Sequence, residues 1–302
     1  MINRYSRVLA AVDFSQPARE AFDFALALSK RDGAALVVVH AVPLDESFNW
    51  HAAERHALME TLRRQAAEAG IAFTDRVQHG DPADVVLLHA RSLKPDVIVA
   101  GTNQRRGLER LGAGSVAERI VAGASVPVLL IPRRGTADAI RPFRHIAVAV
   151  DFSASSDRAV ERALAMAREP GDRVTLLHVV PGFSSGVPPH LYRYGIAEYQ
   201  HQLVTDARRR MQVAVPVNRH SPAAVHTRVL QGETVTEIGR AVERIGADLL
   251  VAGTSARGVV SRALFGTTAA RLLRVTGVPM LAVPHSAASR VVEERTAELL
   301  AA

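Results

Sequence analysis

The stretch VIVAGTNQRRGLERLGAGSVAERIVAGASVPVLLIP at residues 97–132 occurs a second time, as LLVAGTSARGVVSRALFGTTAARLLRVTGVPMLAVP at residues 249–284. The two stretches align without a gap, and thirteen of their positions are identical. Chance similarity is a poor explanation of that match, because self-similarity at a fixed spacing is typical of repeated structural units. The chain is therefore a tandem repeat, and we expect both halves to have the same fold.

An earlier block is also shared: RVLAAVDFS at residues 7–15 matches HIAVAVDFS at residues 145–153. These blocks lie 138 residues apart, whereas the longer stretches lie 152 apart, so the second half carries 14 extra residues between His178 and Gly232. Loops accept insertions at little entropic cost, and PGFSSGVPPH at 181–190 is rich in Gly, Pro and Ser. We expect that loop to hold the insertion.

The composition limits the class of protein. With 302 residues, each half is long enough to bury its own core, and the polar stretch 133–144 predicts domains at 1–138 and 139–302. No apolar run approaches the roughly 18 residues of a membrane span, and none before Asp13 resembles a secretory signal. We therefore expect a cytoplasmic protein. The absence of cysteine excludes disulfides and thiol catalysis, and the net charge of +7 is spread along the chain, which does not favour nucleic-acid binding.

Each half alternates short β-branched runs with amphipathic stretches, which predicts five strands and four helices. Near-continuous apolar strands such as LVVVHAV and DVIVAGT predict a parallel sheet covered by helices on both faces, an α/β fold. The expected first-half strands are 8–12, 35–41, 72–78, 97–100 and 126–131, with helices at 52–69, 83–92 and 116–122 and another after Asp13. The expected second-half strands lie near Ile146, Val174, Thr227, Leu249 and Val278.

Ligands of such sheets bind beyond the carboxyl ends of the strands, where the strand order reverses. The residues at three strand ends in each half are therefore expected to converge. They are Asp13, Ala41 and Gly101 in the first half and Asp151, Val179 and Gly253 in the second.

The repeated stretch also contains a candidate phosphate loop. Gly101-Thr-Asn-Gln104 is followed nine residues later by Gly114-Ser115, and Gly253-Thr-Ser-Ala256 by Gly266-Thr267 with the same spacing. Glycines let backbone N–H groups approach an anion, and a hydroxyl residue at a helix N-terminus adds a donor. A competing interpretation is that Ser115-Val-Ala-Glu118 is only a capping box.

Together these motifs resemble the universal stress protein family in its tandem form. The resemblance rests on V-D-x-S at 12–15 and 150–153, His40-Ala41 and His178-Val179, the Gly-Thr loop, and the Val-Pro strands ending at Pro132 and Pro284. It implies two doubly wound five-stranded parallel sheets of order 3-2-1-4-5, the adenine nucleotide alpha hydrolase-like fold. It also implies an adenine nucleotide such as ATP, with magnesium, as the ligand.

In that resemblance the strand-end residues Asp13, Ala41, Asp151 and Val179 lie near adenine. Gly101, Gly114, Ser115, Gly253, Gly266 and Thr267 lie near ribose and phosphates. The sequence departs from the family's loop pattern at its second glycine, which is Gln104 in the first half and Ala256 in the second. Because Ala256 adds only one methyl group, the second half is the better candidate for binding.

Three functions follow as hypotheses. The leading one is a non-enzymatic stress-response protein with degenerate nucleotide sites and no catalytic residues. The alternatives are weak ATP hydrolysis, for which Asp13 and Asp151 are the only evident bases, and partner binding without nucleotide. No H-E-x-x-H or Walker motif occurs, we expect no protein-held metal, and His40 and His178 are expected to pack or bond loops.

The final strand of each half is apolar and, by the resemblance, lies at a sheet edge. Unpaired edges attract another strand, so we expect the two halves to form an internal pseudo-dimer, with a homodimer as a further expectation.

Overall fold

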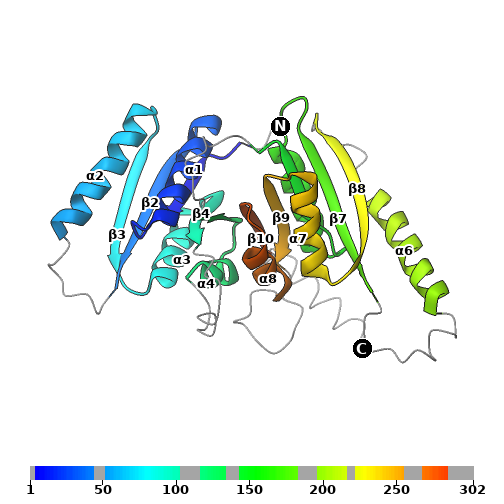
Figure 1. The fold of residues 1–302 in the computed structure, drawn as a ribbon. Helices are drawn as coiled ribbons and strands as arrows, with labels where there is room; N and C mark the ends of the chain where they lie inside the picture. The colour runs from blue at the N-terminus through cyan, green and yellow to red at the C-terminus, as the bar shows by residue number, and fades with distance from the viewer. Residues whose placement is uncertain are drawn as a thin grey trace, which may run out of the picture. The chain divides into compact units, whose positions relative to one another are not determined.

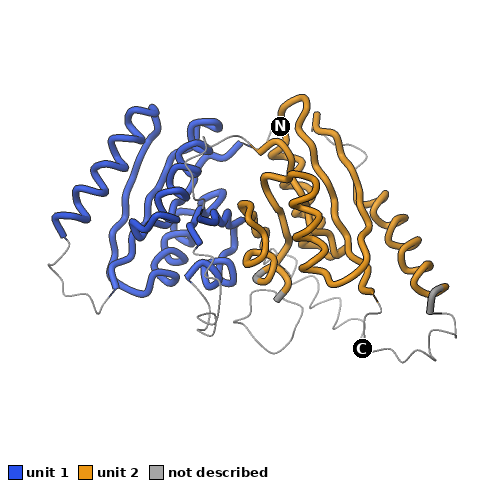
Figure 2. The backbone as a smooth tube through the Cα atoms, viewed as in Figure 1, with its two compact units in different colours: residues 1–141, 259–265 blue, residues 142–258, 266–302 orange. Residues whose placement is uncertain are grey.

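The computed structural model describes residues 4–43, 52–102, 116–133, 143–182, 196–215, 222–254 and 267–284. The chain divides into two compact units, which Figure 2 colours separately. Described residues up to 133 belong to the first unit and those from 143 to the second. The predicted boundary between residues 138 and 139 falls outside the described residues.

The first unit is one parallel sheet whose strands lie in the order β3-β2-β1-β4-β5. Helices connect successive strands along the chain (Figure 1). Its elements are β1 (Arg7–Ala11), α1 (Gln16–Asp32), β2 (Ala35–Val42), α2 (Ala52–Glu68), β3 (Phe73–His79), α3 (Pro82–Leu93), β4 (Val97–Thr102), α4 (Val116–Gly123) and β5 (Val128–Pro132).

The second unit repeats this arrangement, in the order β8-β7-β6-β9-β10. Its elements are β6 (His145–Ala149), α5 (Ala154–Met166), β7 (Arg173–Pro181), α6 (Ile196–Val213), β8 (Ala224–Gly232), α7 (Thr234–Ile245), β9 (Leu249–Thr254), α8 (Thr267–Val275) and β10 (Met280–Pro284). The predicted α/β fold and the 3-2-1-4-5 order of both sheets are confirmed.

The central strands are apolar because helices cover both faces of each sheet. In the first unit α3 packs against α4 and β2, while α1 packs against β1, β4 and β5. Leu9, Leu36, Ile98 and Leu130 are fully buried as a result. The outer strands β3 and β8 differ, because most of their side chains are exposed.

The predicted position of the insertion is only partly correct. The buried residues Met59, Leu62 and Ala66 of α2 correspond in spacing to Val204, Ala207 and Met211 of α6. The connection before α6 spans 182–195, compared with 43–51 before α2, and the connection after it spans 214–223, compared with 69–72. The extra residues are therefore shared between the two connections of α6, because either surface loop accepts them at little entropic cost.

The last strands begin two residues later than predicted. β5 starts at Val128, after Pro127, and the Pro127 carbonyl accepts the Ile98 N–H at 2.9 Å. Pro279 has the same role before β10, with Leu250 as its donor. Proline has no N–H to donate, so it contributes its carbonyl and the strand begins after it.

Candidate functional site

Each unit has a pocket at the carboxyl ends of its first, second and fourth strands. The first-unit pocket has a volume of about 300 Å³ and the second-unit pocket about 330 Å³. These volumes are at the lower end of those of small-molecule sites. Asp13, Ala41 and Gly101 all line the first pocket, and Asp151, Val179 and Gly253 all line the second. The structure thus brings together the strand-end residues that the sequence singled out.

Gly101 and Gly253 are the described glycines of the predicted phosphate loops. Gln104, Gly114, Ser115, Ala256 and Gly266 lie outside the described residues. Thr267 is the first residue of α8, but its side chain is not described. The phosphate loop therefore stays a prediction, as does the capping role of Ser115.

The aspartate at each strand end is held by the serine two residues later. The Ser15 hydroxyl donates to Asp13 Oδ1 at 2.5 Å, and the Ser15 N–H donates to the same oxygen at 3.0 Å. Ser15 also caps α1 by accepting the Ala18 N–H at 3.4 Å. Ser153 makes the same set of bonds with Asp151 and α5. Each carboxylate is exposed and has a fixed orientation, so it can act as an acceptor for a bound ligand.

The histidine of the second strand bonds the backbone at the start of the same turn. His40 Nδ1 lies 2.8 Å from the Val12 carbonyl oxygen, and because a carbonyl only accepts, this nitrogen donates. His178 bonds Val150 in the same way. The predicted loop-bonding role of both histidines is confirmed.

A phenylalanine in a strained turn packs against each histidine with its ring tilted. The ring centroids of Phe14 and His40 are 4.6 Å apart, and those of Phe152 and His178 are 4.4 Å apart. Phe14 and Phe152 both have a φ of 60°, a left-handed conformation that is costly for a bulky side chain. The strain is therefore part of how the V-D-F-S turn places its aspartate.

Gly101 and Gly253 have a packing role that the sequence did not reveal. A Cβ atom on Gly101 would lie 2.4 Å from the backbone carbon and oxygen of Pro17, in the first turn of α1. On Gly253 it would lie 2.5 Å from the backbone carbon of Ser155 in α5. Close approach of a helix to the strand end is sufficient to require glycine here. These two glycines are therefore not in themselves evidence of a phosphate site.

Sequence reasoning missed the residues that the helices contribute to the walls of each pocket. Three wall positions carry hydroxyl groups in the second pocket and none in the first. They are Ser156, Thr234 and Thr268 in the second pocket, and Ala18, Pro82 and Val116 at the equivalent places in the first. The first pocket retains Ser15, whose hydroxyl donates to Asp13. An alignment of the two halves at the 152-residue spacing contains the Thr234 and Thr268 differences, although nothing in it marks them as pocket residues.

A carboxylate and an arginine meet near the start of α3 and of α7. Asp81 accepts the Ala83 and Asp84 N–H groups and bonds Arg119 Nη1 at 2.7 Å, which lowers its pKa. Glu233 accepts the Thr236 N–H at 2.8 Å and pairs with Arg271 at 2.9 Å. The bonds from Thr236, followed by Arg271, lower the pKa of Glu233 to about 2. The N-termini of α3 and α7 are thus already capped by internal anions.

Two kinds of feature are absent from the described ranges of the chain. No group of three or more His, Cys, Asp or Glu residues there is arranged to hold a metal ion. No helix in those ranges is both long and apolar enough to cross a membrane.

Comparison with known proteins gives the same result for each half. The model of the universal stress protein family matches residues 4–132 and again 142–284. A universal stress protein of Methanocaldococcus jannaschii is 28% identical over 143 residues, which are 43% of this chain and 84% of that protein. Universal stress protein G of Escherichia coli O157:H7 is 30% identical over 128 residues, 42% of this chain and 88% of that one.

Solved structures resemble the whole chain. The crystal structure of a universal stress protein from Archaeoglobus fulgidus aligns with a TM-score of 0.70 and 18% identity, covering 95% of this chain and 98% of that one. A putative universal stress protein from Pseudomonas aeruginosa aligns with a TM-score of 0.59 and 17% identity, covering 94% of each chain. At these identities the likeness concerns the fold alone.

Proposed function

The chain belongs to the universal stress protein family, and from that premise we propose that its second half binds an adenine nucleotide in the pocket at the ends of β6, β7 and β9. The protein would act as a non-enzymatic stress-response protein of the cytoplasm. Nucleotide occupancy would alter its conformation or its choice of partner.

The observation that supports this proposal is the difference between the two pocket walls. Thr234 and Thr268 offer hydroxyl groups where the first pocket has Pro82 and Val116. Ser156, although its hydroxyl donates to the Ser153 carbonyl at 3.0 Å, keeps its oxygen as an acceptor. Polar ligand groups buried against apolar walls lose hydrogen bonds to water without replacement, at a cost of about 1–3 kcal/mol each. A ribose or phosphate therefore favours the second pocket.

The residues divide between the parts of the ligand. Asp151 and Val179 would contact the base, and the pocket volume of about 330 Å³ suits the nucleoside part. The phosphates would extend toward the N-terminus of α8, where the helix dipole favours an anion and where Gly266 and Thr267 are predicted to bind. Magnesium would accompany the phosphates, with no cluster of protein ligands among the described residues.

Weak ATP hydrolysis remains the alternative function. It requires a base near the terminal phosphate. Asp151 is the candidate general base, but its Oδ1 atom accepts two bonds from Ser153. It also lies at the end of the pocket assigned to the adenine ring, away from the terminal phosphate. This arrangement favours binding without catalysis.

Calorimetric titration of ATP tests the proposal. The double variant Thr234→Val, Thr268→Val removes two hydroxyls and should weaken binding about tenfold or more, because each lost bond to a buried polar group costs about 1 kcal/mol. Thr227→Val is the matched control, since Thr227 is exposed on β8, outside the pocket lining. Equal affinity of the double variant and the control would contradict the proposal, and absence of any ATP binding would favour the partner-binding alternative.

A further inference from the structure

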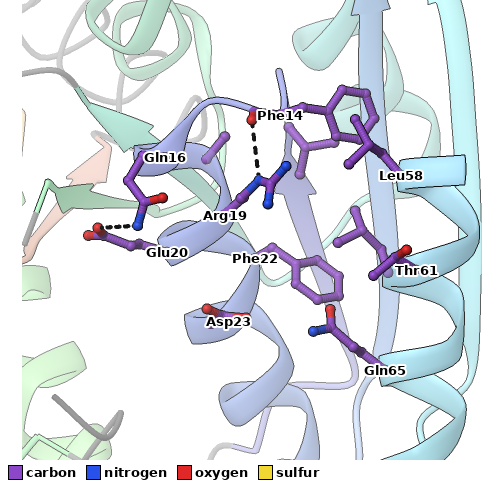
Figure 3. Close-up of a pocket in the computed structure, with 12 residues that line it drawn as sticks. Phe14, Gln16, Arg19, Glu20, Phe22, Asp23, Leu58, Thr61 and Gln65 are labelled. Carbon is purple, nitrogen blue, oxygen red and sulfur yellow. Dashed lines mark hydrogen bonds between the residues drawn. The ribbon is translucent and has the colours of Figure 1, made fainter. Parts of the chain in front are cut away.

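A second cavity of the first unit lies on the other face of the sheet, between α1 and α2 (Figure 3). Its volume is about 270 Å³. It shares Val12 and Ala18 with the strand-end pocket but is otherwise lined by different side chains.

Apolar side chains form part of its lining, beside polar side chains such as Thr61 and Gln65. Phe22 of α1 and Leu62 of α2 are buried, and Leu58 is half-buried. The ring of Phe14 closes one end, held there by the left-handed turn and by its contact with His40. Such a chamber suits a compact apolar group.

One cation lies at this chamber. Figure 3 shows Arg19 and Phe22 on the side of α1 that faces α2, with Arg19 Nε donating to the Phe14 carbonyl oxygen at 3.4 Å. Among the described residues no carboxylate lies within ion-pair distance of Arg19. Its terminal N–H groups are therefore donors that the described structure does not use.

The nearby carboxyl groups do not compete for Arg19. Glu20 accepts a bond from Gln16 at 3.1 Å, on the side of α1 away from α2 (Figure 3). Asp23 also lines the cavity, and burial, together with repulsion from Glu20, raises its pKa. Arg19 is thus the one basic side chain among the described residues that line the cavity.

The equivalent groove of the second unit carries different charged side chains. Asp157 stands there at the position of Arg19, and the groove between α5 and α6 is lined by Asp157, Glu161, Arg209 and Arg210. The guanidinium carbon of Arg210 lies 3.9 Å from the centre of the Phe152 ring, at the helical position that Gln65 occupies in α2. In that unit an internal cation covers the aromatic face and the α1-type helix presents acid.

We propose that the cavity between α1 and α2 binds a small carboxylate with an apolar or aromatic body. The carboxylate would accept bonds from the terminal nitrogens of Arg19, and the body would lie among Phe14, Phe22 and Leu58. Guanidinium-to-carboxylate bonds are among the strongest hydrogen bonds of proteins. The equivalent groove of the second unit would bind the same ligand more weakly, because Asp157 stands in place of Arg19 and Arg210 already covers the Phe152 ring.

Phenylacetate, 2-phenylethanol and 2-phenylethylamine are matched probes for this site, since they differ mainly in charge. Titration into the full chain, followed by NMR, should show phenylacetate binding about tenfold more tightly than the alcohol and the amine most weakly. Arg19→Gln should remove the preference for the acid while leaving weak binding of the alcohol. Leu58→Trp, which fills the chamber, should remove binding of both.

Asp157→Asn is the control in the second unit and should leave the affinity for phenylacetate unchanged. The circular dichroism of each variant, compared with that of the parent chain, shows whether it is folded. The proposal is overturned if phenylacetate binds no more tightly than the alcohol, or if folded Arg19→Gln keeps the same preference. Absence of phenylacetate binding at millimolar concentration overturns it equally.

Discussion

The two strand-end pockets are built by the same backbone devices and differ in their walls. Both use an aspartate held by serine, a histidine bonded to the first strand and a glycine under the first helical turn. Their helix-borne walls differ in polarity, with Pro82 and Val116 in one and Thr234 and Thr268 in the other. The shared devices therefore describe the scaffold, and the differing residues carry the information about ligands.

The largest effect is expected from the glycines of the scaffold. Gly101→Ala and Gly253→Ala each place a Cβ atom within about 2.5 Å of helix backbone, which cannot move aside as a flexible side chain can. Each should destabilise its own unit by about 3 kcal/mol or more. Urea denaturation measures the loss.

Gly277→Ala is the control for both glycines, because a Cβ atom there meets nothing within 4 Å. Its effect should be under about 1 kcal/mol. If Gly253→Ala were as mild as the control, the packing explanation of this glycine would be wrong and a ligand-binding reason would regain weight.

The second prediction converts one pocket into the other. The triple change Ala18→Ser, Pro82→Thr, Val116→Thr gives the first pocket the hydroxyls of the second. If these wall residues determine whether a pocket binds ATP, the number of ATP molecules bound per chain in a calorimetric titration should rise from one toward two. A stoichiometry that stays at one would show that Gln104, outside the described residues, closes the first site by itself.

The loop residues provide the third prediction, at the level of single side chains. Gly266→Val should weaken ATP binding more than Gly114→Val, because Ala256 obstructs its loop less than Gln104 does. Calorimetry on the two variants compares them directly. Equal losses would remove the assignment of binding to the second half.

Much of this fold could be predicted because its signals are local. Apolar runs and amphipathic stretches place the first-unit strands and the helices α2, α3 and α4 within about two residues, which is the usual precision of such boundaries. Strand-end residues could be predicted for the same reason, since Asp13 and Gly101 follow recognisable strands. Parallel pairing then brings them to one edge.

The parts that could not be predicted depend on tertiary contacts. Thr234 and Thr268 look like ordinary first-turn residues of helices, and only the packing of α7 and α8 turns them toward the pocket. Gly101 looked like a phosphate-binding residue because the close approach of Pro17 is invisible in the sequence. The division of the insertion around α6 was hidden because only the buried face of that helix gives its register.

A smaller effect, on stability, is expected at the N-terminal ends of β1 and β6. Arg7 of the first unit corresponds there to His145 of the second. The His145 ring is buried, and its Nε2 lies 2.9 Å from Thr175 Oγ1. Burial, and next the charge of Arg173, lowers the pKa of His145, while the Ile245 backbone and then Asp248 oppose the shift. The neutral ring thus stabilises the second unit above the ordinary histidine pKa of about 6.5, and this contribution is lost as the pH falls below it.

Urea denaturation at pH 7.5 and pH 5.5 checks this linkage. The free energy of unfolding of the second unit should be lower at pH 5.5 than at pH 7.5, and the difference should be smaller in His145→Gln. Burial also raises the pKa of Asp248, and this shift acts in the opposite direction, because it stabilises the unit at lower pH. An identical pH dependence in both proteins would assign the effect elsewhere.

The last prediction concerns association of the halves. The fragment 1–138 ends in the apolar strand β5, so it should self-associate when the second half is missing. Sedimentation at tens of micromolar measures this. A monomeric fragment would contradict the pseudo-dimer expectation, and the full chain provides the reference.

The left-handed phenylalanines have a consequence for evolution under selection. A bulky residue at a φ of 60° costs about 1–2 kcal/mol, whereas glycine or asparagine adopts this conformation readily. Both halves nevertheless carry phenylalanine, stacked on histidine in each case. A library selected for heat resistance alone should therefore enrich Asn or Gly at positions 14 and 152, while a library selected for ligand binding should retain the aromatic ring. The difference between the two enrichments would measure how much stability this protein has given up for its turns.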